Sequence, residues 1–376
     1  MNAKYAHLRT AAVAGIALAS VTAARAGDGS IVVYGVVDTF VGHMAANGKS
    51  ITALDDNGLL VSRIGFRGFE SLGGDTRVKF ALENGFNPVT GAQKDGNRLF
   101  DRQAWVGYES SIGEFRAGRQ NTKLFLIGDD VDASQRATFA SFINNTGVVA
   151  RYDNDLAYIS PKWAGVDAEL HHAFGGQAGS ANGGTINQAA IEYRGQAVPL
   201  YLAAYDLQAK PFSGQAYTST VNVETIVANL DYGRGKVYYA WERTNNITGF
   251  GSGQALSNVG GYAPGTSPVA AAAASYYDFN QASVDFRPTP GSSLGLIYGV
   301  GKDKSGGGNG VRGGGLVGEF DLSRRTRIYA AYGFLKNDHL AAFKLSGGGA
   351  PTKNLATADV EGQTVRGFQA GVRFFF

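Results

Sequence analysis

The chain has 376 residues, of which 54 are glycine and none is cysteine, and only 17% are charged. Glycine is about twice as frequent as its usual share of ~7%, and charged residues fall well below the usual ~25%. The absence of cysteine excludes a disulfide framework, a thiolate metal site and a cysteine nucleophile. After residue 26 no apolar run approaches the ~18 residues that a membrane-spanning helix needs, so a helical membrane protein is excluded as well.

The first 26 residues are expected to be a secretory signal peptide. A basic start with Lys4 and Arg9 precedes an apolar stretch over residues 11–21, and residues 24–26 form the cleavage pattern ARA. The alternative is a buried N-terminal helix. Removing this segment takes away three of the 34 basic residues and none of the 31 acidic ones, so 31 of each remain. With a formal net charge of zero, nothing points to a nucleic-acid partner.

From residue 27 onward the dominant pattern is alternation with a period of two, which places successive side chains on opposite faces of a sheet. In residues 76–84, for example, Val78, Phe80 and Leu82 alternate with Arg77, Lys79 and Glu83. Comparable runs begin near residues 30, 59, 75, 99, 113, 149, 165, 185, 198, 218, 235, 274, 291, 312, 325 and 363. We therefore expect one all-β domain over residues 27–376 with about sixteen strands.

Short turns alternate along the chain with long connections rich in Gly, Ser and Asn, such as residues 243–273, 302–311 and 337–361. One face of each strand is apolar, and the other carries more charge than the core of a sandwich could hold unpaired. A closed antiparallel barrel with lipid outside and water inside satisfies both faces, because closure leaves no backbone group unpaired in hydrocarbon. A barrel of about sixteen strands is wide enough to leave an aqueous channel.

Seven segments, in this order, resemble the general porins of Gram-negative bacteria, in particular the beta-proteobacterial branch with neisserial and Comamonas-type porins. They are residues 31–38 (IVVYGVVD), 62–68 (SRIGFRG), 82–87 (LENGFN), 98–107 (RLFDRQAWVG), 118–120 (GRQ), 151–155 (RYDND) and 322–330 (LSRRTRIYA). The chain also ends on Phe376. The outer loops at residues 243–273 and 302–311 depart from the family pattern.

This resemblance implies a homotrimer of barrels in the bacterial outer membrane, in contact with lipid and lipopolysaccharide. It implies that the third loop, residues 121–148, folds into the barrel and narrows it. It also implies that Phe376 is the signal read by the barrel-assembly machinery.

Selectivity in such a channel needs a narrow waist with fixed charges where little water screens them. The resemblance singles out Arg63, Arg102 and Arg151 as pore-wall arginines, with Arg119 at the root of the loop. Opposite them we expect the loop acids Asp129, Asp130 and Asp132. Alternation adds further lumen-wall residues: Arg67, Arg77, Lys79 and Arg116. Because the basic residues outnumber the acids, we expect a mild preference for anions; plain solvation of a wet lumen is the alternative role.

The orientation of two residues, Arg102 and Tyr34, is left open by the sequence. Alternation puts Arg102 on the outward side with Val106 and Tyr108, so either a bulge near Asp101 turns it into the pore or it faces a neighbouring subunit. Tyr34 at a strand end suits an aromatic girdle at the membrane interface or a subunit contact.

No catalytic constellation, metal site or cofactor motif is found in the sequence. The expected function is a water-filled channel for passive diffusion of ions and small hydrophilic solutes. The alternatives are a substrate-specific outer-membrane channel and, from other classes, an outer-membrane adhesin or enzyme.

Overall fold

The computed structural model describes residues 29–134, 136–143, 150–211, 220–245, 277–304, 308–346 and 351–376, apart from the side chain of Asp129. The expected signal peptide, residues 1–26, lies outside the described residues. In the part described, seventeen strands form one sheet in which every pairing is antiparallel. None of the helices described is long and apolar enough to cross a membrane.

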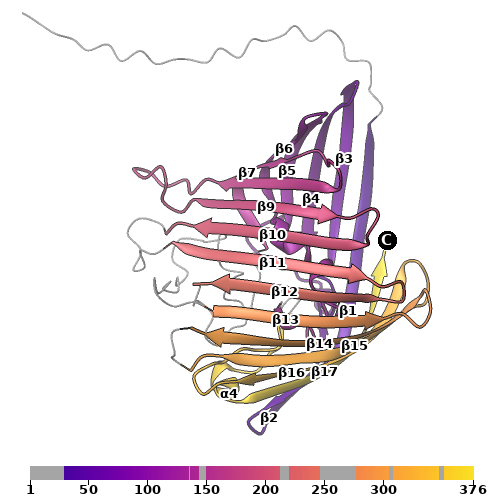
Figure 1. The fold of residues 1–376 in the computed structure, drawn as a ribbon, viewed down its shortest axis with the longest axis vertical. Helices are drawn as coiled ribbons and strands as arrows, with labels where there is room; N and C mark the ends of the chain where they lie inside the picture. Colours follow the sequence, from indigo (N-terminus) through magenta and orange to yellow (C-terminus); the bar gives the residue numbers. More distant parts are fainter. Residues whose placement is uncertain are drawn as a thin grey trace, which may run out of the picture.

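The strands follow one another in chain order, and Figure 1 shows many of them side by side. The first nine are β1 (Ser30–Ala46), β2 (Lys49–Asp56), β3 (Arg63–Gly73), β4 (Thr76–Gly85), β5 (Gln103–Ser110), β6 (Gly113–Asn121), β7 (Arg151–Ile159), β8 (Val166–Ala173) and β9 (Ile186–Arg194). The other eight are β10 (Leu200–Ala209), β11 (Val221–Asp231), β12 (Lys236–Thr244), β13 (Tyr277–Phe286), β14 (Ser292–Asp303), β15 (Val311–Asp321), β16 (Thr326–Asn337) and β17 (Thr364–Phe375). The helices are short: α1 (Lys123–Leu126), α2 (Gly128–Val131) and α4 (Thr357–Val360).

The sheet closes on itself because β1 pairs with β17, in a register that sets Val36 against Phe375 and Ala45 against Arg366. The other edge of β1 pairs with β2 along one half and with β3 along the other. The strands β2 and β3 thus form one interrupted strand, and the wall has sixteen positions. The predicted barrel of about sixteen strands is confirmed, and each predicted start lies within about four residues of an observed one.

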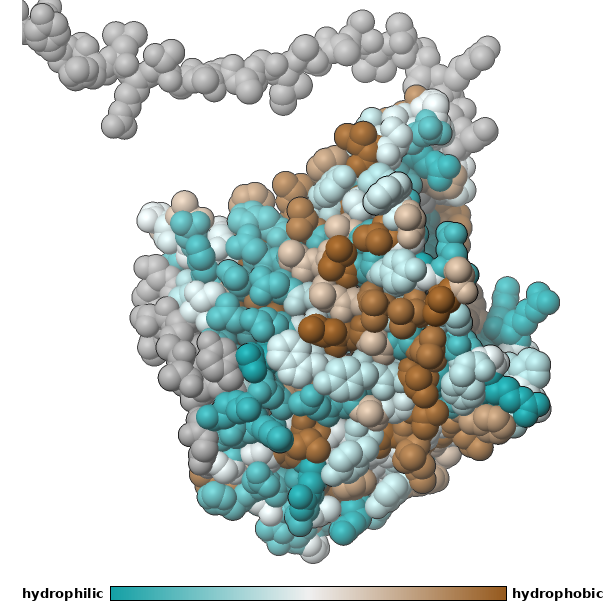
Figure 2. Space-filling model, viewed as in Figure 1, coloured by the Kyte–Doolittle hydropathy of each residue, from teal (hydrophilic) through white to brown (hydrophobic). Residues whose placement is uncertain are grey.

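The two faces of the wall differ as the alternation predicts. On β17, Phe368 and Phe374 are exposed on the outside, whereas Gln369 and Arg373 are buried on the inside. On β11, Ile226 is 48% exposed while its neighbour Thr225 is 2% exposed. Figure 2 shows hydrophobic residues gathered in a band across the strands, with hydrophilic residues beyond it. An apolar belt around a polar interior is the arrangement expected of a barrel in lipid.

The two ends of the barrel are unequal. Short turns such as residues 74–75, 111–112 and 232–235 lie at one end, together with the start of β1 and the end of β17. The long connections, including residues 86–102, 122–150 and 338–363, lie at the other. We call these the short-turn end and the long-loop end. The asymmetry matches the prediction and is typical of outer-membrane barrels.

The interruption between β2 and β3 was not predicted, and a buried carboxylate on β1 stabilises it. Asp38 is fully buried and accepts hydrogen bonds from the backbone N–H groups of Gly58, Leu59 and Leu60, at 3.2, 3.0 and 2.9 Å. Tyr329 on β16 donates a further hydrogen bond to Asp38. The chain therefore leaves the wall at Asn57, whose φ is 67°, and turns into the barrel.

Candidate functional site: the constriction

The connection between β6 and β7 runs into the barrel, which confirms the expected inward-folded third loop. It begins at Thr122, whose hydroxyl accepts a hydrogen bond of 3.0 Å from the N–H of Phe125 and caps α1. The helix α2 follows at once and contacts β11 and β12. The loop thus leaves the wall at β6 and reaches strands on the far side of the ring.

Side chains of the wall hold the loop by its backbone. The N–H of Ala133 donates to Ser283 on β13 at 3.0 Å, and the N–H of Ile143 donates to Gln281 at 2.8 Å. Further along the ring, Gln369 on β17 accepts from the N–H of Phe139 at 3.0 Å. These bonds satisfy backbone groups that no regular element pairs, so the crossing is fixed at several points.

The middle of the loop also packs on an apolar part of the inner wall. Phe139 and Phe142 are almost fully buried in a cluster that includes Phe40 and Phe279, and Phe40 meets Phe139 edge-on at 5.6 Å between ring centroids. Glycines make room for this contact. A Cβ at Gly333 on β16 would lie 1.5 Å from the carbonyl oxygen of Phe139, so this position needs glycine.

The interruption of the second strand supports the same loop. The carbonyl of Gly58 accepts a hydrogen bond from the N–H of Thr138 at 2.8 Å and another from Gln369 at 2.9 Å. The hydroxyl of Thr138 donates to the carbonyl of Asn57 at 2.5 Å. The inward turn after β2 is therefore one of the supports of the constriction loop.

A lysine on α1 ties the root of the loop to acidic residues of β8 and β9. The Nζ of Lys123 lies 3.0 Å from Glu192, 3.5 Å from Glu169 and 3.7 Å from Asp167. Burial disfavours the charged ammonium, but the carboxylates of Glu169 and Glu192 outweigh it and raise the pKa of Lys123. Lys123 thus remains charged and holds α1 against the wall.

His171 on β8 extends this anchor. Its Nδ1 lies 2.6 Å from a carboxylate oxygen of Asp155, and its Nε2 lies 2.8 Å from one of Glu169. Both ring nitrogens are thus within hydrogen-bond distance of a carboxylate, and the ring links β7 to the carboxylate cluster around Lys123. Glu169 lies two residues before His171 on β8, and Asp155 lies on the neighbouring strand β7.

Two of the expected pore-wall arginines share one carboxylate. The Nε of Arg102 lies 2.6 Å from Glu83, and the Nε of Arg63 lies 3.4 Å from the other oxygen of Glu83. Glu83 stands on the inner row of β4, and Arg102 is only 2% exposed. Arg102 directly precedes β5, where its backbone N–H bonds the carbonyl of Glu83 at 3.1 Å. The structure therefore places Arg102 on the inside, away from Val106 and Tyr108.

Three guanidinium groups surround the ring of Phe125 on α1. The Cζ atoms of Arg136, Arg151 and Arg102 lie 4.6, 4.8 and 5.9 Å from the ring centroid. A cation over an aromatic face is attracted by the ring quadrupole. Arg151 keeps two buried N–H groups, at Nε and Nη2, for which the described residues offer no partner. The root of the loop is thus strongly basic. Arg136 escaped sequence analysis because nothing in the local pattern marks it.

Arg119 belongs to a different network. On β6 it pairs with Ala104, and it lies between Gly118 and Gln120, where the register with β7 shifts. Its guanidinium bonds the carbonyl of Asp101 at 2.6 Å and the carboxylate of Asp153. Asp153 also pairs with Arg98 at 2.8 Å. The structure brings Arg63, Arg102 and Arg151 together at the loop, whereas Arg119 has Asp153 as its carboxylate partner.

The loop acids are placed differently from one another. Asp130 pairs with Arg194 on β9 at 2.7 Å and lies 3.8 Å from Lys236 on β12. Asp132 is fully buried and accepts hydrogen bonds from both serines of the loop, Ser134 and Ser141, and from Gln281 at 3.3 Å. Burial raises the pKa of Asp132, and these hydrogen bonds oppose that shift. The side chain of Asp129 lies outside the described residues.

The other expected lumen-wall residues stand on the inner rows of β3, β4 and β6. Lys79 bridges Glu114 at 2.8 Å and Glu109 at 3.2 Å, and Arg116 bonds Glu114 at 2.7 Å. Arg67 and Arg77 instead have no carboxylate within 4.0 Å among the described residues. Tyr34 also faces inward and donates to Glu83 at 2.9 Å, so its expected place in an outer girdle is wrong.

Closed antiparallel strands, an apolar belt, a charged interior and a loop folded across it define an outer-membrane channel protein. A family model described as Gram-negative porin matches residues 10–340. The chain therefore belongs to the Gram-negative porin family, and it is an outer-membrane protein.

Three relatives illustrate this membership. An outer membrane porin of Bordetella pertussis is 31% identical over 176 residues, which are 42% of this chain and 46% of that protein, so this match spans less than half of it. Outer membrane porin protein 32 of Delftia acidovorans is 24% identical over 390 residues, with 96% of this chain and 98% of that protein covered. The solved anion-selective porin from Comamonas acidovorans aligns with a TM-score of 0.73 at 21% identity, covering 93% of this chain and 100% of that one.

Proposed function

We propose that the chain forms a water-filled channel for passive diffusion of ions and small hydrophilic solutes, with a mild preference for anions. The observation that carries the preference is the difference between the two sides of the lumen. Arg67 and Arg77 stand on the inner wall without a carboxylate partner among the described residues. On the loop, Asp130 is paired with Arg194 and Asp132 is buried.

The sign of the preference follows from electrostatics. Paired charges largely cancel at a distance, whereas an unpaired charge acts on a passing ion over about one Debye length, ~8 Å at physiological ionic strength. The unpaired cations raise the local concentration of anions in the lumen. The Comamonas relative is described as anion-selective, which agrees with this sign.

The constriction residues keep separate roles in this proposal. Arg63, Arg102 and Arg151 form the basic root of the loop, and Asp132 acts as an internal anchor instead of a charge presented to solutes. Arg67, Arg77, Lys79 and Arg116 make up the charged wall below that root. Arg119 stands at the root of the loop, where it pairs with Asp153.

We further propose that the chain works as a homotrimer in contact with lipid and lipopolysaccharide. Phe376 is the assembly signal in this proposal. Its backbone N–H and C=O pair with Gly35 at 3.2 and 3.1 Å, so the last residue helps to close the barrel. A Cβ at Gly35 would lie 2.2 Å from the Phe376 ring, and the ring thus covers this glycine.

The test is the reversal potential of purified protein in a planar bilayer under a KCl gradient. Wild-type channels should favour chloride, and the double variant Arg67→Glu with Arg77→Glu should shift the reversal potential toward the cation side. Arg324→Glu, at an exposed turn, is the matched control and should leave it unchanged. A double variant that keeps the wild-type value would refute the assignment.

A further inference from the structure

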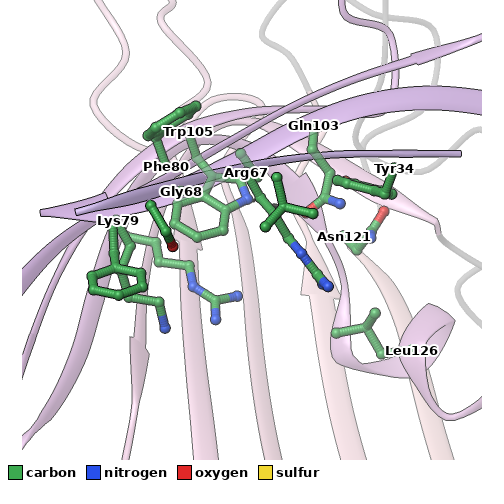
Figure 3. Close-up of a pocket in the computed structure, with 14 residues that line it drawn as sticks. Tyr34, Arg67, Gly68, Lys79, Phe80, Gln103, Trp105, Asn121 and Leu126 are labelled. Atoms are coloured by element: carbon green, nitrogen blue, oxygen red, sulfur yellow. Dashed lines mark hydrogen bonds between the residues drawn. The ribbon is translucent and has the colours of Figure 1, made fainter. Parts of the chain in front are cut away.

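A cavity of about 440 Å³ lies on the inner wall, between the basic root of the loop and the short-turn end. Strands β1, β3, β4, β5 and β6 form its wall, and Leu126 of α1 faces it from the loop (Figure 3). This volume is within the range of ~300–1,000 Å³ that is usual for small-molecule pockets. Leu126 belongs to the constriction loop, but none of the charged residues expected at the constriction lines the cavity.

Two pairs, each of an arginine guanidinium over an aromatic ring, line the cavity. The guanidinium of Arg116 lies 4.5 Å from the ring of Trp105, and that of Arg67 lies 5.1 Å from the ring of Tyr34. The indole N–H of Trp105 donates to Gln103 at 3.0 Å, and the hydroxyl of Tyr34 donates to Glu83. Both rings are therefore held in place before any ligand arrives, which reduces the entropic cost of binding.

Among the charged residues that line the cavity, Arg67 is the one without a carboxylate partner in the described part of the chain. The carboxylates of Glu109 and Glu114 are engaged by Lys79 and Arg116. Arg67 has no acidic partner within 4.0 Å among the described residues, and Figure 3 shows its side chain pointing from the sheet into the barrel. An arginine with free donors binds a carboxylate through two parallel hydrogen bonds.

The surface opposite Arg67 is apolar. Leu126 is 45% exposed although it sits on the inward-folded loop, and Figure 3 places it across from Arg67. An exposed leucine inside a polar lumen offers an apolar contact that a chloride ion or a sugar cannot use. The cavity thus combines a cation that has no acidic partner among the described residues, flat stacking surfaces and one apolar wall.

We propose that this cavity is a binding subsite for small aromatic carboxylates of the benzoate type. The carboxylate pairs with Arg67, and the ring lies among Trp105, Tyr34 and Leu126. This inference rests on the proposed channel function and adds a preferred class of solute to it. The subsite lies in the diffusion path, so an aromatic acid that binds there reduces the chloride current while it stays.

The experiment compares two monocarboxylates of equal charge and similar size, benzoate and cyclohexanecarboxylate, as blockers of the chloride current through single channels. Benzoate should block saturably. Its half-blocking concentration should be lower than that of cyclohexanecarboxylate by about fivefold or more, because an aromatic ring gains additional binding free energy from contact with another aromatic ring. Trp105→Leu should remove this difference. Trp105→Phe should keep most of it, which separates loss of the ring from misfolding.

Charge and position have their own controls. Arg67→Gln should raise the half-blocking concentration of both acids by about tenfold, the effect of losing one charge-assisted pair. Arg77→Gln removes the same charge from the inner row of the neighbouring strand β4, outside the cavity, and should leave the benzoate preference intact. Channels that conduct chloride but respond equally to both acids would overturn the subsite alone. Protein that forms no channels would overturn the proposed function.

Discussion

Tyr329 on β16 donates a hydrogen bond to Asp38 on β1, and the two residues are 291 positions apart in the chain. Asp38 uses its remaining acceptors to hold the backbone of Gly58, Leu59 and Leu60 inside the barrel. Gly58 in turn supports the constriction loop through Thr138. One buried carboxylate thus connects barrel closure, the interruption of the second strand and the position of the loop.

We expect Asp38→Leu to weaken the barrel and loosen the loop together. The variant leaves three buried N–H groups and one hydroxyl without their acceptor, and each buried group left unpaired costs ~1–3 kcal/mol. The temperature at which the folded band disappears on a gel should fall clearly, and single-channel current should become noisier. Tyr332→Phe, on an exposed outward ring of β16, is the control and should leave both unchanged. A quiet Asp38→Leu channel of normal stability would contradict this role.

Gly333→Val is predicted to displace the loop. A Cβ at this position would lie 1.5 Å from the carbonyl oxygen of Phe139, and a strand backbone cannot yield by that amount without moving its neighbour. We therefore expect folded channels with a larger and more variable conductance, because Phe139 leaves its place on the wall. Gly318→Ala, where the nearest atom lies 3.4 Å from the added Cβ, is the control. Unchanged conductance in folded Gly333→Val would show that the loop is not held there.

Lys123→Gln should change ion preference through the carboxylate that it releases. Without the ammonium, Glu192 loses its cationic partner while Glu169 keeps His171, so the uncompensated carboxylate of Glu192 contributes negative charge to the lumen. The reversal potential under a KCl gradient should move toward cations. Lys162→Gln is the matched control, since its Nζ lies 3.3 Å from Asp167 but its side chain is 51% exposed near the short-turn end. An equal shift of the reversal potential in both variants would show that Lys123 has no particular role in anchoring α1.

The Lys123 anchor also has a pH dependence. The pKa of Lys123 is raised above the usual 10.5 in the folded protein. A basic group whose pKa is higher in the folded than in the unfolded protein stabilises the fold. This stabilisation is complete at pH values below the pKa of the unfolded state, and it is lost as the pH rises through the pKa of the folded state. The difference in unfolding temperature between wild type and Lys123→Gln should therefore be constant from neutral pH to about 10 and shrink above 10.5. A difference that disappears near pH 8 would exclude this lysine as the cause.

The barrel could be predicted from the sequence, because the alternation of apolar and polar residues along each strand depends only on whether a face meets lipid or water. The sequence was insufficient between Asp56 and Arg63, where Leu59 and Leu60 resemble the start of a strand but lie in an inward turn held by Asp38. Asp38 bonds backbone groups about twenty residues further along the chain, so no pattern in the sequence around residues 56–63 indicates the inward turn.

The same limit applies to the constriction. Sequence placed Arg63, Arg102 and Arg151 near the loop, and the structure brings them together, but it could not show that two of them share the single carboxylate of Glu83. It also assigned Asp132 to the pore, although burial and four hydrogen-bond contacts from loop and wall hold it out of the water. Local patterns report which face a residue occupies, and they do not report its partners.

The most direct test of a wall with electrolyte inside and lipid outside is cysteine labelling, which the cysteine-free chain makes unambiguous. Single variants Arg67→Cys and Ile226→Cys, reconstituted in liposomes, would be treated with a charged, membrane-impermeant thiol reagent. The reagent should label Arg67→Cys rapidly and reduce its chloride current, and it should leave Ile226→Cys unlabelled. Rapid labelling of Ile226→Cys together with protection of Arg67→Cys would contradict the account.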